Sequence, residues 1–239
     1  MTIIEHLDIS AGSVVAITGC GGKTSLSELI AGQLRDKKVL LSTTTKIFPM
    51  KTCEAILCET LQQCMAHRPQ TGIQCFGILN KRSGKLEALP GPALKELVSR
   101  YDVALLEADG ARGLPCKGWL ETEPVVPDYC THTIGVATLR ARGRAASRET
   151  VHNLPEFLSL TGTQDGEPIT AQALETMICA PGGMFKSSAG RLYLVINQVE
   201  DGDTEHEATS LLKSIKEKYP DRFSGLISGS VQLNNWRRI

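Results

Sequence analysis

The sequence lacks an excess of charge of either sign, because its 239 residues carry 26 Lys and Arg against 26 Asp and Glu. Proteins that bind the nucleic-acid backbone usually carry a basic excess, so no nucleic acid is expected as a partner. No apolar run approaches the roughly 18 residues that a membrane-spanning helix needs. The first ten residues also lack the pattern of a secretory signal. We therefore expect a cytoplasmic protein that does not bind membranes.

Paired cysteines are missing as well. The chain has eight cysteines, but none forms a CxxC pair and no Cys/His grouping has zinc-finger spacing. This pattern favours reduced thiols in a cytosolic protein over a disulfide framework or a structural metal site.

What the sequence does contain is an alternation of strand-like and helix-like segments. The spacing of apolar residues predicts strands over 13–18, 38–42, 102–106, 131–137, 192–196 and 223–227, helices over 23–34, 92–100 and 205–218, and a hairpin formed by 73–79 and 85–89. This order predicts an α/β fold: a mostly parallel sheet flanked by helices, P-loop NTPase-like, with the hairpin and a small helical insertion at about 149–180. The length suggests a single domain over 1–239.

The segment TGCGGKTS, residues 18–25, lies between the first strand and the first helix. The full phosphate-loop signature G-x-x-x-x-G-K-[ST] requires a glycine where this chain has Ile17. The other requirements are met, since the glycines let backbone amides surround an anion, Lys23 can reach outer phosphates and the Thr24 hydroxyl suits Mg²⁺. The alternative is a glycine-rich turn before a helix. We predict an ATP or GTP site that binds Mg²⁺ and is formed by Gly19, Cys20, Gly21, Gly22, Lys23, Thr24 and Ser25.

Two acids follow the strand that ends at residue 106. Glu107 and Asp109 occupy the position where a Walker-B-like strand presents a carboxylate to Mg²⁺ or its water. The alternatives are a helix cap or a surface loop. We predict that Glu107 or Asp109 holds the metal together with Thr24, and that both acids act in catalysis with Lys23. Spacing alone does not say which acid contacts the metal.

The strand over 192–196 ends in Asn197-Gln198-Val199-Glu200, which resembles a base-recognition segment of the kind Asn-Lys-x-Asp. Asn197 could bond a purine ring through its amide, which both donates and accepts hydrogen bonds. Gln198 and Glu200 differ from that pattern, so the base stays open at this point.

Six segments together resemble one family. They are ITGCGGKTS, LLSTTTKIFP, LLEADGARGLPCKGW, EPVVPD, GEPIT and LVINQVE, in this order over most of the chain. In them the sequence is similar to the YqeC-type family, accessory proteins of selenium-dependent molybdenum hydroxylases. The resemblance implies a cytosolic P-loop protein concerned with a selenium-containing molybdenum cofactor.

Basic residues supply candidates for the contact with a second substrate or a partner. Arginine forks suit phosphate, which a molybdenum-pterin cofactor carries. The alternative for the arginine-rich stretch 140–148 is a solvated loop. We expect the cofactor or a selenium-dependent hydroxylase to contact Lys46, Arg112, Lys117, Arg140, Arg142 and Arg144.

The sequence thus predicts a Mg²⁺-dependent nucleoside triphosphatase or kinase-like enzyme that acts in cofactor maturation. Two alternatives stay open: a phosphoryl- or nucleotidyl-transferase that acts on a phosphate-bearing acceptor, and a scaffold that binds an anion or nucleotide without hydrolysing it.

Overall fold

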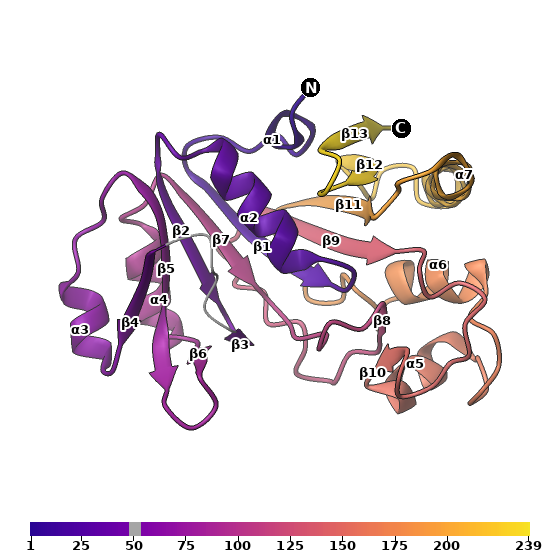
Figure 1. Ribbon diagram of the computed structural model, residues 1–239, viewed down its shortest axis with the longest axis horizontal. Coiled ribbons are helices and arrows are strands. Elements are labelled where there is room, and N and C mark those ends of the chain that lie inside the picture. The colour runs from indigo at the N-terminus through magenta and orange to yellow at the C-terminus, as the bar shows by residue number, and fades with distance from the viewer. Residues whose placement is uncertain (48–53) are drawn as a thin grey trace.

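The protein is built around one large β-sheet, and the computed structural model describes residues 1–47 and 54–239 (Figure 1). The strands of this sheet are β1 (Ser13–Gly19), β2 (Lys38–Thr43), β3 (Lys46–Ile47), β4 (Glu54–Cys58), β5 (Gly72–Asn80), β6 (Lys85–Glu87), β7 (Val103–Glu107), β9 (His132–Thr138), β11 (Arg191–Asn197), β12 (Gly225–Ser230) and β13 (Asn235–Arg238). Their order is β13-β12-β11-β9-β1-β7-β2-β5-β6-β3, and β4 pairs with β5. A separate two-stranded sheet is formed by β8 (Cys116–Lys117) and β10 (Val151–His152).

The central part of the large sheet is parallel. β1 pairs in parallel with β7 on one side and with β9 on the other. β2 continues the parallel sheet beyond β7, and β11 and β12 continue it beyond β9. The predicted hairpin is the antiparallel pair β5–β6. The predicted α/β class is therefore confirmed, whereas the extent of a single domain over 1–239 stays a prediction.

The strand order changes direction next to β1. The chain passes from β1 to β2 on one side, with β7 later inserted between them, and then continues through β9, β11 and β12 on the other side. Open parallel sheets bind their ligands beyond the carboxyl ends of the strands at such a switch point. We therefore expect a ligand site among the residues that follow β1, β7, β9 and β11.

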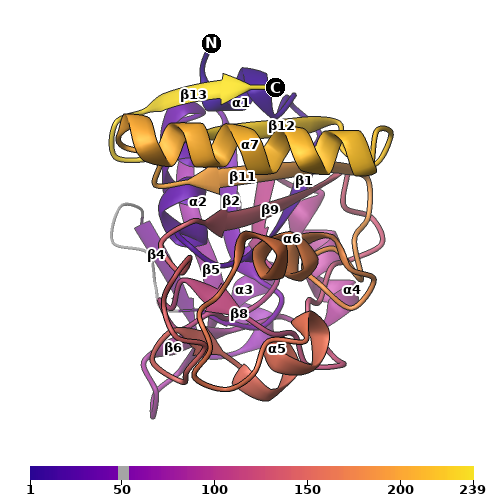
Figure 2. The same ribbon diagram turned by 90° about the vertical axis from the view of Figure 1, so that its right-hand side faces the viewer.

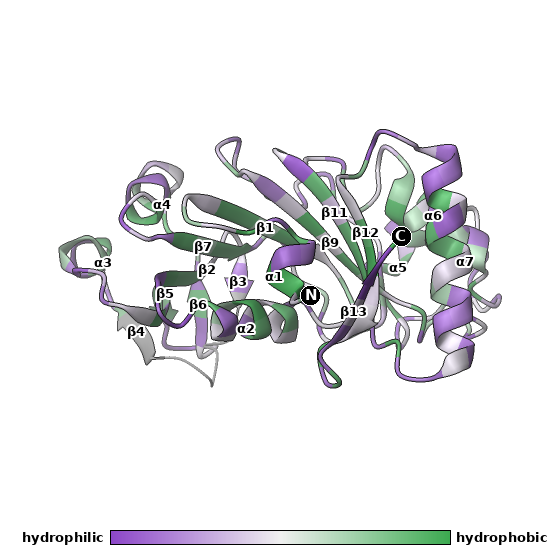
Figure 3. Ribbon diagram, turned by 90° about the horizontal axis from the view of Figure 1, so that it is seen from above, coloured by the Kyte–Doolittle hydropathy of each residue, from purple (hydrophilic) through white to green (hydrophobic). Residues whose placement is uncertain are grey.

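Helices cover both faces of the sheet. They are α1 (Ile3–His6), α2 (Lys23–Gln33), α3 (Leu61–Ala66), α4 (Gly91–Val98), α5 (Leu154–Thr161), α6 (Ala171–Cys179) and α7 (Gly202–Lys218). Because side chains alternate along a strand, Ile17 of β1 packs with residues of α1 and α2, and the adjacent Ala16 packs with residues of α4. α7 lies across β11 and β12 (Figure 2). Figure 3 shows hydrophobic residues along β1 and β7, whereas α7 carries both hydrophilic and hydrophobic residues.

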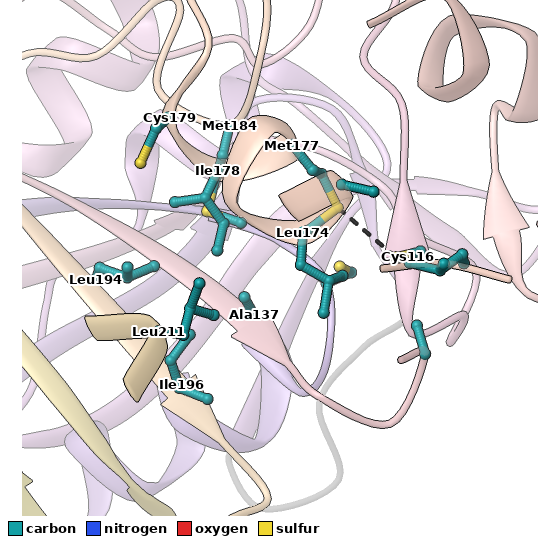
Figure 4. Packing of buried hydrophobic residues seen from close by; sticks show 14 of the residues in the cluster. Cys116, Ala137, Leu174, Met177, Ile178, Cys179, Met184, Leu194, Ile196 and Leu211 are labelled. Atoms are coloured by element: carbon teal, nitrogen blue, oxygen red, sulfur yellow. Dashed lines mark hydrogen bonds between the residues drawn. The ribbon is translucent and has the colours of Figure 1, made fainter. Parts of the chain in front are cut away.

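The two helices predicted within 149–180 are α5 and α6; α5 packs against α6, and α6 packs beside α7 (Figure 2). Figure 4 shows how the side chains of α6 lie against two strands and α7. The labelled residues belong to one apolar cluster: Leu174, Met177 and Ile178 of α6, Ala137 of β9, Leu194 and Ile196 of β11, and Leu211 of α7. This insertion therefore borders the carboxyl ends of β9 and β11.

No helix in the described part of the chain is both long and apolar enough to cross a membrane. Every cysteine in residues 1–47 and 54–239 is a free, buried thiol. Cys53, and Phe48 and Pro49 of the LLSTTTKIFP segment, lie outside the described residues.

Candidate functional site

The turn between β1 and α2, here called the 19–24 loop, is closed by glycines with positive φ angles. The φ angles of Gly19, Gly21 and Gly22 are 104°, 88° and 114°. A β-carbon at Gly19 would lie 2.2 Å from the Val136 carbonyl oxygen, and one at Gly22 would lie 2.6 Å from Asn197 Nδ2. Both the backbone angle and the close neighbours therefore require glycine at these positions.

The position that breaks the motif lies outside this turn. Ile17 is a fully buried residue of β1, and the chain leaves the strand only after Gly19. Among the described residues, no hydrogen-bond acceptor pairs with the backbone amides of residues 21–24, and no side chain caps α2 at Gly22. These amides are therefore available to an anion at the start of α2.

Lys23 and Asp109 form a buried ion pair behind the loop. Lys23 Nζ lies 3.2 Å from Asp109 Oδ1 and donates to the Gly19 carbonyl at 2.8 Å. Burial acts to lower the pKa of Lys23, but the Asp109 and Glu107 carboxylates together outweigh it, so the pKa is raised. The ammonium group therefore stays charged at the base of the loop.

The carboxylate of Asp109 is surrounded by donors. Its oxygens accept from Thr18 Oγ1 at 2.8 Å, from the Gly19 amide at 3.1 and 3.2 Å, and from Trp119 Nε1 at 2.6 Å. Lys117 Nζ lies 3.7 Å away and is itself bonded to the Gly110 carbonyl and to Glu123. Burial acts to raise the pKa of Asp109, but Lys23 and Lys117 and the hydrogen bonds from Gly19 and Trp119 together outweigh it, so the pKa is lowered. Asp109 is thus a buried anion that positions Lys23.

Glu107 lies at the end of β7, next to the start of α2. Its Oε1 accepts a hydrogen bond from the exposed Thr24 hydroxyl at 2.6 Å. Burial raises the pKa of Glu107 against the opposing effects of Lys23 and Thr24. The end of β2 joins this arrangement, because the Thr43 hydroxyl and the Thr44 amide both donate to the Glu107 carbonyl at 3.0 Å. Two oxygen groups suited to a hard cation, one of them a carboxylate, therefore meet at the mouth of the loop.

Asn197 holds the loop from the other side. Its Nδ2 donates to the Gly21 carbonyl at 2.9 Å, and its Oδ1 accepts from the Val231 amide at 3.1 Å. Gln198 accepts from the Thr138 hydroxyl at 2.7 Å. Both sides of the Asn197 amide are occupied, so this residue connects the 19–24 loop to the end of β12.

The remaining predicted residues differ in their surroundings. Ser25 is exposed at the start of α2, whereas Cys20 is buried and donates from Sγ to the Pro115 carbonyl at 3.1 Å. Burial raises the pKa of Cys20 to about 12, so its thiol is protonated at neutral pH. Lys117 is fully buried beneath Asp109, away from any surface where a second substrate could bind.

The surface basic residues are spread over several elements. Lys46 pairs with Glu87 at 2.9 Å, and Arg140 pairs with Glu200 at 3.2 Å. Arg142 pairs with Glu207 of α7. Arg112, with φ 51°, and Arg144 are exposed. The arginines at 140–144 therefore do not form one group around the 19–24 loop.

Sequence reasoning missed three polar contributors to this region. Thr18 and Trp119 bind Asp109, and Ser230 Oγ donates to Glu200 Oε1 at 3.0 Å. Thr18 belongs to the glycine-rich motif and Trp119 to the segment LLEADGARGLPCKGW, but nothing in their spacing indicated a contact with Asp109. Ser230 lies outside every quoted motif and is brought in only by the pairing of β12 with β11.

Comparison with known proteins agrees with these motifs. The family model described as YqeC protein matches residues 15–155, a range that includes the 19–24 loop, Glu107 and Asp109. The Escherichia coli (strain K12) protein described as "Uncharacterized protein YqeC" is 32% identical over 182 residues, which cover 73% of this chain and 71% of the relative. The chain belongs to the YqeC family.

Proposed function

We propose that the protein is a Mg²⁺-dependent nucleoside triphosphatase or kinase-like enzyme that acts in maturation of the selenium-containing molybdenum cofactor of a hydroxylase. Binding of a Mg²⁺-nucleotide is supported by one observation: Thr24 and Glu107 lie in contact at 2.6 Å, beside the unpaired amides of residues 21–24. The role in cofactor maturation is what the resemblance of the six sequence segments to the YqeC-type family implies.

The proposed roles follow from the positions of the groups. The amides at the start of α2 hold a phosphate, and Lys23 neutralises charge on the outer phosphates. Asp109 orients Lys23 from below through their 3.2 Å ion pair. Phosphoryl transfer asks a protein mainly to position groups and to stabilise charge, and these residues can do both.

Thr24 and Glu107 would hold the magnesium ion, which would replace the 2.6 Å hydrogen bond between them. Mg²⁺ prefers oxygen ligands and usually keeps several waters or substrate oxygens rather than a complete protein cage. No group of three or more His, Cys, Asp or Glu residues suited to a metal occurs within residues 1–47 and 54–239. When held by Thr24 and Glu107, the ion would reduce the negative charge on the outer phosphates.

The metal proposal predicts a specific effect of Glu107→Gln. Mg²⁺ should strengthen nucleotide binding in the parent, and this gain should shrink by about tenfold or more in the variant because a charged ligand is lost. Binding without Mg²⁺ should change little. Since burial raises the pKa of Glu107, the gain from Mg²⁺ in the parent should grow as pH rises through that pKa. Calorimetric titration with and without Mg²⁺ measures both effects.

The exposed Glu121→Gln variant is the matched control for the loss of one acid. Equal losses of affinity with and without Mg²⁺ in the Glu107→Gln variant would remove Glu107 from the metal site.

A transferase that acts on a phosphate-bearing acceptor is the second candidate function. It is favoured by a hollow of about 480 Å³ between α6 and α7, which Arg142 borders. Product analysis separates the possibilities: free phosphate alone supports hydrolysis, a modified acceptor supports transfer, and no turnover supports a scaffold.

If this hollow receives the acceptor, the double variant Arg142→Gln/Arg144→Gln should weaken binding of a molybdenum-pterin cofactor by about tenfold, because arginine contacts to phosphate are lost. Nucleotide affinity should stay within about twofold, since Arg142 points to α7 rather than to the 19–24 loop. The loss should diminish as salt is raised. Titration with the cofactor and with the nucleotide checks whether the two ligands bind at separate sites. Loss of nucleotide binding in the double variant would refute this separation. If neither ligand is affected, the stretch is a solvated loop.

A further inference from the structure

The strand order indicates how the proposed nucleotide would be oriented across the carboxyl ends of the strands. The proposed metal ligands are Glu107, the last residue of β7, and Thr24, which lies in the first turn of α2 and donates to Glu107. Mg²⁺ bridges the outer phosphates of a nucleotide, so these phosphates face β7. The nucleoside then extends to the opposite side of β1, where β9, β11 and β12 end.

The ends of β11 and β12 border the 19–24 loop on that side. Asn197 joins them, because its amide contacts the Gly21 carbonyl and the Val231 amide. The Val199 amide also donates to the Gly229 carbonyl at 3.0 Å. The segments after both strands are therefore held together beside the loop, where the base of the nucleotide would lie.

Glu200 presents a fixed carboxylate in this region. Its Oε1 accepts from Ser230 Oγ at 3.0 Å, and its Oε2 accepts from Arg140 at 3.2 Å. A carboxylate offers about four lone-pair positions, so each oxygen retains capacity for a further donor. The side chain is 31% exposed and borders a hollow of about 290 Å³. It is therefore both oriented and accessible.

The two neighbouring acids are already engaged in other roles. Asp201 caps α7 by accepting from the Thr204 amide at 2.8 Å, and Glu205 pairs with Arg237 of β13. Glu200 differs from both in that each of its carboxylate oxygens is oriented by a separate donor, Ser230 or Arg140.

The chemistry of the bases decides which nucleotide suits such a group. Guanine presents adjacent N1–H and N2–H₂ donors, which two carboxylate oxygens can accept together. Adenine presents a lone pair at N1, which a carboxylate repels. We propose that the nucleotide is a guanine nucleotide and that Glu200 reads its base; this inference rests on the nucleotide site proposed above.

Binding of fluorescent derivatives of GDP, ADP and XDP, each with Mg²⁺, tests the proposal. The parent should bind GDP about 100-fold more tightly than ADP, because two charge-assisted hydrogen bonds distinguish them. In Glu200→Gln, one acceptor becomes a donor, which opposes the N2 amine of guanine but suits the C2 oxygen of xanthine. This variant should lose about tenfold or more in GDP affinity and should bind XDP more tightly than the parent does. The gain in XDP affinity separates base reading from a general loss of structure.

Asp203→Asn is the control, because it removes an exposed charge in the first turn of α7 that does not line the hollow beside Glu200, and it should retain the preference for GDP. Equal binding of ADP and GDP by the parent, or unchanged GDP affinity in Glu200→Gln, would overturn the guanine assignment and leave the proposed nucleotide site standing. If none of the diphosphates binds, the proposed function fails together with this inference.

Discussion

Replacing Lys23 with alanine should weaken Mg²⁺-nucleotide binding by about 10- to 150-fold, the range expected when a charge-assisted contact is lost. Affinity should fall because the Lys23 ammonium lies at the base of the 19–24 loop, 2.8 Å from the Gly19 carbonyl, where it can neutralise phosphate charge. Calorimetric titration of the purified variant gives the affinity. Lys37→Ala, which removes an exposed lysine just after α2, is the control and should bind as the parent does.

The fold should survive this change even though the lysine is buried. Asp109 would keep Thr18, the Gly19 amide and Trp119 as hydrogen-bond donors, and Lys117 as a nearby positive charge. Thermal unfolding establishes that the variant is folded before its affinity is read. A folded variant with the parent's affinity would show that the loop does not bind nucleotide phosphates through Lys23.

The largest effect on stability is expected for Asp109→Asn, with a loss of about 3–5 kcal/mol in the free energy of unfolding. The substitution leaves Lys23 and Lys117 buried without the carboxylate between them. Urea denaturation measures the loss. The exposed Asp36→Asn variant should stay within about 0.5 kcal/mol of the parent.

The difference in the free energy of unfolding between the parent and Asp109→Asn should depend on pH. Because the folded state lowers the pKa of Asp109, its contribution is complete above the unfolded pKa of about 4 and is lost as pH falls through the folded value. The parent and Asp109→Asn should therefore approach equal stability in strong acid. A constant difference at all pH values would mean that the charge of Asp109 is not what stabilises the fold.

The sequence predicted the central elements because their signals are local. The strands and helices that form the core of the sheet, including the insertion helices, follow from apolar spacing and from the glycine-rich turn. β13 was missed since Asn235–Arg238 is a polar strand that is defined by pairing with β12 rather than by its own composition. β8 and β10 have two residues each, too few for a periodic signal.

The candidate site was predictable only in part for the same reason. The residues 19–25 are contiguous, so their spacing was visible. Lys117 was expected on an accessible surface, but the pairing of β8 with β10 places it under Asp109. Asn197 was expected to contact the purine base of the nucleotide. In the structure it instead bonds the Gly21 carbonyl and the Val231 amide, which is possible because β11 and β12 lie side by side. Contacts between distant segments carry no signature in one sequence.

The hydrogen bonds of Asn197 have a consequence for avidity. By joining the Gly21 carbonyl to the Val231 amide, this side chain fixes the separation between the phosphate-binding and base-binding halves of the proposed site. A nucleotide that spans both halves then binds as a bidentate ligand, whose second contact benefits from a high effective concentration. Pyrophosphate and free nucleoside each engage one half and gain none of this advantage. Asn197 would thus contribute to affinity by holding two weak sites at the spacing of one molecule.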